Sequence, residues 1–162
     1  MTRLFLPALL LLAACPHAEE TQDILACGAA DNAGTAVTAG ADADDTAPEL
    51  GFSETPWTVS LTDGEATYVQ VHLDNDAEWL LFANPAEVVT GVWHDGVEQT
   101  LPEPTAAPNC ADDVPEQFAL SSEAGTVHLE LGPAAADSVW LMVLSSDGHG
   151  HEHPGRVDED QR

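Results

Sequence analysis

A regular series of short β-type segments most constrains what this chain can fold into. Apolar and polar residues alternate in "WTVSL" (57–61), "TYVQVHL" (67–73) and "GTVHLEL" (125–131). Alternate residues of a strand point to opposite faces, so each segment places a row of apolar side chains on one side. Turn residues separate the segments, which favours short antiparallel connections.

Four further stretches extend this series. "EWLLFA" (78–83) is apolar on both faces, and "EVVTGVWHDGVEQTL" (87–101) holds an Asp-Gly pair between two β-rich runs, which predicts a hairpin. "QFALS" (117–121) and "DSVWLMVL" (137–144) complete the set. Seven or eight strands over about 95 residues predict an all-β domain, a small antiparallel β-sandwich.

The chain ends differ in composition from this domain. Residues 16 to 50 are rich in Ala, Asp, Gly and Thr without apolar periodicity, and the polar stretch after 146 contains three histidines. Such segments bury too little to fold alone, so we expect a disordered linker and a disordered tail. The expected organisation is a leader (1–14), an acylated cysteine with an acidic linker (15–50), the β-sandwich domain (51–146) and a His-rich acidic tail (147–162).

The N-terminus predicts export and a lipid anchor. Arg3 precedes an uncharged apolar run that ends at Ala14, which fits a secretory signal and is too short to span a bilayer. "LAAC" (12–15) resembles the lipobox of bacterial lipoproteins. That resemblance implies cleavage before Cys15, its acylation, and attachment to the bilayer of the cell envelope, and Pro16 at the next position favours the outer membrane. The alternative is a plain secretory signal with a chance cysteine.

Cys27 and Cys110 are the two cysteines that remain after Cys15. An even pair in an oxidising compartment favours a disulfide. The alternative is a pair of free thiols, one of which could join the histidines as a metal ligand.

The charge balance excludes several classes of partner. The chain carries 29 acidic and 3 basic residues, a net charge of −26, and it contains no lysine. Nucleic-acid binding and a basic patch for anionic lipid headgroups both need Lys and Arg, so neither is expected. The acidic surface favours cations as partners, although adaptation to salty surroundings explains it equally well.

No catalytic motif stands out. The chain lacks a G-x-S-x-G nucleophile motif, an H-E-x-x-H metalloprotease motif and a Gly-rich phosphate loop. We therefore do not expect an enzyme.

The C-terminal "DGHGHEHPG" (147–155) is the main candidate for chemistry. His149, His151 and His153 alternate, so an extended backbone points them the same way, and Asp147 is a further candidate ligand. Neutral imidazole binds Zn, Cu and Ni well. The same residues also fit an inert solvated tail or a tail that responds to pH.

Two histidines of the predicted strands are secondary candidates. His72 and His128 lie on the expected outward faces, and they could meet if their strands are neighbours. His94 precedes the Asp-Gly turn, where we expect it to be merely exposed.

The segment from Cys110 to His153 resembles the C-terminal half of a family of acidic bacterial lipoproteins. The similarity covers about residues 27–153 and rests on Gly-Thr at the start of one strand, Gly-Pro at its end, an apolar last strand and the histidines. The resemblance implies a cysteine-containing N-terminal stretch, a small β domain and a His-rich tail. The strand rhythm is also similar to small β-sandwich domains found after secreted peptidases. Neither resemblance implies an activity.

These observations together predict a non-enzymatic, membrane-anchored lipoprotein that binds or buffers divalent transition metal through its tail. The alternative is a structural or protein-interaction module of the cell envelope with an incidental His-rich tail. The sequence identifies no protein partner.

Overall fold

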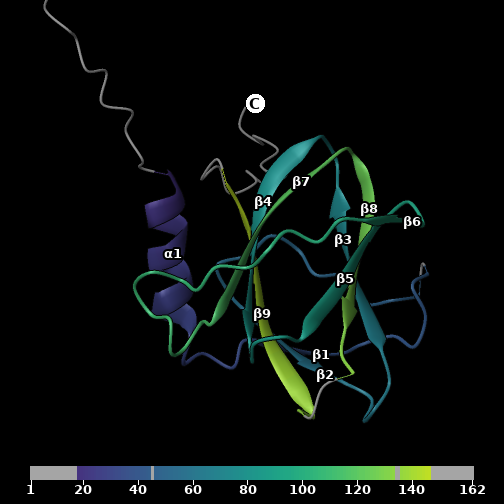
Figure 1. Cartoon of the computed structure of the whole chain (residues 1–162), viewed down its shortest axis with the longest axis horizontal. Coiled ribbons are helices and arrows are strands. Elements are labelled where there is room, and N and C mark those ends of the chain that lie inside the picture. Colours follow the sequence, from purple (N-terminus) through teal and green to yellow (C-terminus); the bar gives the residue numbers. More distant parts are fainter. Residues whose placement is uncertain (1–17, 45, 134–135, 147–162) are drawn as a thin grey trace, which may run out of the picture.

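The computed structural model describes residues 18–44, 46–133 and 136–146 (Figure 1). In these residues it contains one helix and nine strands, namely α1 (Ala18–Ala29), β1 (Thr35–Thr38), β2 (Trp57–Ser60), β3 (Thr67–Leu73), β4 (Ala77–Asn84), β5 (Val89–His94), β6 (Val97–Gln99), β7 (Glu116–Ser122), β8 (Gly125–Leu131) and β9 (Ser138–Ser145). The all-β class expected from the strand rhythm is confirmed. Among the described residues, no helix has the length and apolar content needed to cross a bilayer.

The strands form two sheets that enclose the main core. The five-stranded sheet has the order β1-β2-β9-β4-β7, and the four-stranded sheet has the order β3-β8-β5-β6. Every pair is antiparallel except β1 with β2. Buried side chains from both sheets, such as Leu81 and Val143 from one and Val69 and Leu129 from the other, belong to one cluster. The predicted small antiparallel sandwich is therefore confirmed.

The alternation in the sequence explains the burial of the strands. Val69, Val71 and Leu73 of β3 are buried as expected, while the residues between them are half-buried or exposed. The Asp95-Gly96 pair forms the predicted hairpin between β5 and β6, with φ of 47° and 78° at the two residues. Two consecutive positive φ angles match the twist of the flanking strands, and Asp and Gly tolerate them best.

A second, smaller core lies on the outer face of the five-stranded sheet. Leu80 and Phe82 of β4 point to this face and pack with Met142 of β9 and with Ala26 and Ala29 of α1. Figure 1 shows α1 beside this sheet. The helix cover explains why β4 is apolar on both faces.

The prediction of a solvated linker up to residue 50 is wrong where the structure describes this segment. Residues 18–29 form α1, residues 35–38 form an edge strand, and Leu50 is fully buried in the main core. The buried residues of the missed helix are Ala26 and Ala29 together with the polar Gln22 and Asp23, so the helix has only a weak apolar stripe. The folded domain therefore includes residues that precede 51.

Two long edges of the sandwich are covered by connecting segments. Gly40 and Tyr68 of β3 exchange two backbone hydrogen bonds of 2.8 Å, and the Gln70 amide donates to Pro48 O at 2.9 Å. Thr105 pairs with Gln117 of β7 in the same way. Covering the edge backbone limits unwanted strand pairing with other chains.

Candidate functional site

The main predicted site lies outside the described residues. His149, His151, His153 and Asp147 belong to the C-terminal stretch beyond residue 146, and the predicted lipidation site Cys15 precedes α1. Within the part of the chain that the structure describes, no group of three or more His, Cys, Asp or Glu side chains could hold a metal ion.

Cys27 of α1 and Cys110 of the β6–β7 connection form the predicted disulfide. The Sγ atoms are 2.06 Å apart, and the two residues are 83 positions apart in the chain. Both cysteines pack against the second core. The alternative of free thiols that join the histidines does not hold.

His72 and His128 do lie on neighbouring strands, as the secondary prediction required. His72 of β3 is opposite Thr126, whereas His128 of β8 is opposite Gln70, so the two histidines are diagonal neighbours on the outer face of the four-stranded sheet. His72 is exposed, with Nε2 3.7 Å from Asp74 Oδ1. No third ligand completes a metal site with this pair among the described residues.

The expectation that His128 faces solvent is wrong, because its residue is only 6% exposed. Nε2 lies 3.2 Å from the backbone carbonyl oxygen of Asp44, in the segment between β1 and β2. The side chain is on the outward face of its strand, but this segment covers it. Nε2 of His128 is thus engaged by the backbone, whereas Nδ1 is buried and has no hydrogen-bond partner among the described residues.

Two titratable side chains near this covered face, Asp44 and Tyr68, have shifted pKa values. The hydroxyl and backbone amide of Thr46 donate to Asp44 Oδ1 and hold the pKa of Asp44 below its ordinary value, with a smaller contribution from His128. Burial, followed by the charge of Glu130, raises the pKa of Tyr68, whose hydroxyl donates to Glu130 Oε2 at 3.3 Å. The contact between Asp44 and His128 holds the segment between β1 and β2 against β8, and the contact between Tyr68 and Glu130 joins β3 to β8.

His94 is the functional candidate that the sequence reasoning missed. Its side chain is only 17% exposed, and its register partner is the buried core residue Val127. Nε2 is shielded from solvent and has no hydrogen-bond partner among the described residues; Asp95 Oδ2 is 3.9 Å away. The signal was available, because His94 is two residues after the inward-facing Val92 and must share its face.

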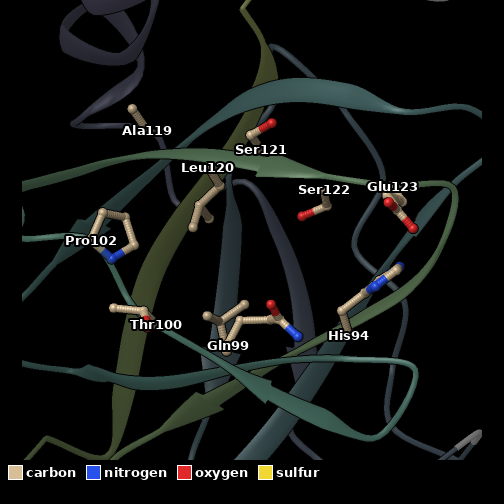
Figure 2. Close-up of a pocket in the computed structure, with 10 residues that line it drawn as sticks. His94, Gln99, Thr100, Pro102, Ala119, Leu120, Ser121, Ser122 and Glu123 are labelled. Atoms are coloured by element: carbon tan, nitrogen blue, oxygen red, sulfur yellow. The ribbon is translucent and has the colours of Figure 1, made fainter.

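A cleft of about 570 Å³ opens beside His94, between β5–β6 of one sheet and β7 of the other (Figure 2). Val92 and Leu120 are buried at its base, and Gln99 and Ser122 line its walls. Its volume lies within the range of small-molecule sites, which is about 300–1,000 Å³. Its lining is more polar than that of most small-molecule sites, which are lined mainly by hydrophobic and aromatic side chains.

A scan against protein-family models finds no match, and a search of curated proteins finds no significant relative.

Proposed function

We propose that the protein is a non-enzymatic lipoprotein of the bacterial cell envelope that binds divalent transition metal through its C-terminal histidines. The alternating His149, His151 and His153 are the single observation that carries metal binding. Neutral imidazoles suit Zn²⁺, Cu²⁺ and Ni²⁺, and Asp147 adds a carboxylate. The strongly acidic composition supports the proposal because it raises the local concentration of cations.

Cysteine usage supports the envelope location. The disulfide between Cys27 and Cys110 is typical of an oxidising compartment. It leaves Cys15 as the remaining cysteine of the chain, at the end of an apolar leader and in a sequence that resembles a lipobox. Several acyl chains on Cys15 would hold the protein firmly on a bilayer, with outer-membrane placement favoured by Pro16.

The anchor is tested by mass spectrometry of the protein purified from membranes of a bacterial host. We expect an N-terminal peptide that begins at Cys15 and carries acyl chains, and we expect Cys15→Ser to release the protein from the membrane fraction. An unmodified Cys15 in a soluble mature protein would show a plain secretory signal instead.

Metal binding is tested by calorimetric titration of the mature chain with Zn²⁺ and Cu²⁺ under chelator-controlled conditions. Replacement of His149, His151 and His153 by alanine should weaken binding at least about tenfold, because it removes all three imidazoles. His72→Ala is the matched control, since His72 is exposed and lies outside any metal cluster of the described residues. Equal heats for the wild type and the triple variant would favour the structural or interaction module.

A further inference from the structure

A buried carboxylate lies against the disulfide that joins α1 to the β6–β7 connection. Asp23 is only 2% exposed, and its Oδ1 atom is 3.8 Å from Cys27 Sγ. Asp23 is about one helical turn before Cys27, and residues four apart on a helix share a face. We propose that Asp23 protects this disulfide from reduction by thiols, because its negative charge opposes the charge that thiol–disulfide exchange brings to the sulfur atoms. The proposal depends neither on the tail nor on the lipid anchor.

Asp23 is fixed to both segments that the disulfide joins. Its backbone belongs to α1, and its Oδ2 atom accepts a hydrogen bond from the side-chain amide of Asn109, the residue before Cys110. A rotation of the carboxylate away from the bridge would break this contact. The fold on both sides of the disulfide therefore holds the negative charge beside the sulfur atoms.

No permanent positive charge offsets Asp23 within the part of the chain that the structure describes. These residues contain no Lys or Arg, and their two histidine ion pairs do not involve Asp23. Asp112 and Asp113, which are exposed, follow Cys110 directly in the sequence after Ala111 and add negative charge to that segment. A charge that is shielded from water acts more strongly on its neighbours than an exposed one. Asp23 is thus the charge with the largest expected effect on the bridge.

Thiol–disulfide exchange brings negative charge to Cys27 whichever sulfur is attacked. A thiolate that attacks Cys110 Sγ forms a mixed disulfide there, and the electron pair of the broken bond leaves on Cys27 Sγ, which then takes a proton from water. A thiolate that attacks Cys27 Sγ brings its own charge to that atom and expels Cys110 as the thiolate. In both cases a second thiolate of the reductant attacks the mixed disulfide, so the reductant is oxidised to its disulfide and the protein keeps two thiols. The Asp23 carboxylate raises the free energy of both transition states.

The test measures how fast 2-mercaptoethanol reduces the folded mature chain carrying Cys15→Ser, in which Cys27 and Cys110 are the only cysteines. The free thiols are trapped by alkylation and counted by mass spectrometry. We expect Asp23→Asn to accelerate reduction at least about tenfold, because part of a unit charge develops near the carboxylate in the transition state. Asp63→Asn removes the same charge from an exposed turn between β2 and β3 and should change the rate less than about twofold. An unchanged rate in Asp23→Asn, or equal acceleration in both variants, overturns the proposal.

Charged reductants separate electrostatic protection from a simple loosening of the helix. Mercaptoacetate carries a negative charge beside its thiol, and cysteamine carries a positive one. Asp23→Asn should accelerate mercaptoacetate more than cysteamine, whereas a looser helix would accelerate both equally. Asn109→Ala removes the hydrogen bond but keeps the carboxylate, so it should accelerate reduction less than Asp23→Asn does. Equal acceleration of the two reductants, or equal effects of the two variants, would assign the effect to helix packing and overturn the proposal.

Discussion

Loss of the Cys27–Cys110 disulfide should destabilise the protein mainly through its unfolded state. The bridge closes a loop of 83 residues that contains β1 to β6. In the chain-entropy model, a loop of this length restricts the unfolded chain enough to contribute about 4.5 kcal/mol. The native helix α1 also packs through Ala26 and Ala29, so we expect the variant lacking both cysteines to keep its fold.

Urea unfolding of a Cys27→Ala/Cys110→Ala variant measures this contribution, with Cys15→Ser in the variant and in its parent. With a slope of about 2 kcal/mol per M of urea, a loss of about 4.5 kcal/mol lowers the transition midpoint by about 2 M. Near-UV circular dichroism before unfolding checks that the tryptophan environments are retained. Reduction of the parent with a thiol should reproduce the same midpoint.

Two results would refute this reasoning. A loss smaller than about 1 kcal/mol would show that the unfolded chain is already compact enough to make the bridge redundant. A native spectrum that collapses in the variant would show that the bridge, and not the alanine contacts, holds α1 on the sheet.

Three further predictions follow from the structure. Tyr68 is the only tyrosine, so absorbance titration reads its raised pKa directly. Glu130→Gln should lower the pKa of Tyr68, although burial still keeps it above the ordinary value. An unchanged titration midpoint of Tyr68 would contradict its contact with Glu130. Because the folded pKa exceeds the unfolded value near 10, stability should be retained below that pH and fall as pH rises toward the folded pKa. Gly125→Ala should cost about 1–3 kcal/mol in urea unfolding, because φ is 142° and the new Cβ would meet His94; wild-type stability would refute this. Sodium chloride should raise the urea midpoint, most steeply below about 0.2 M, because it screens repulsion among the acidic groups; a midpoint independent of salt would contradict the prediction.

The sequence predicted the strands because their burial follows from local alternation. Val69, Val71 and Leu73 face the core as their spacing requires, and Asp95-Gly96 forms a hairpin through its own backbone preferences. The disulfide followed from the number of cysteines and the expected compartment. These features depend on short-range patterns or simple pairing.

The errors arose where distant segments meet. The cover over His128 comes from Asp44, which is 84 residues away, and no local pattern reports such a contact. Helix α1 was missed because its buried residues are two alanines and the polar Gln22 and Asp23, which carry little apolar signal. The orientation of His94 was readable from Val92, but the adjacent turn favoured an exposed interpretation. The tail histidines remain a prediction from sequence.

The early start of α1 limits how far an anchored domain could move from its membrane. A flexible linker from Cys15 to residue 50 would have had a root-mean-square extension of about 30 Å. Ala18, where α1 begins, is only three positions after Cys15, and three residue steps reach at most about 10 Å. If Cys15 is acylated as proposed, the domain is confined to a thin layer at the bilayer surface. The domain would then meet only molecules close to the lipid headgroups and could not reach across a wide aqueous space.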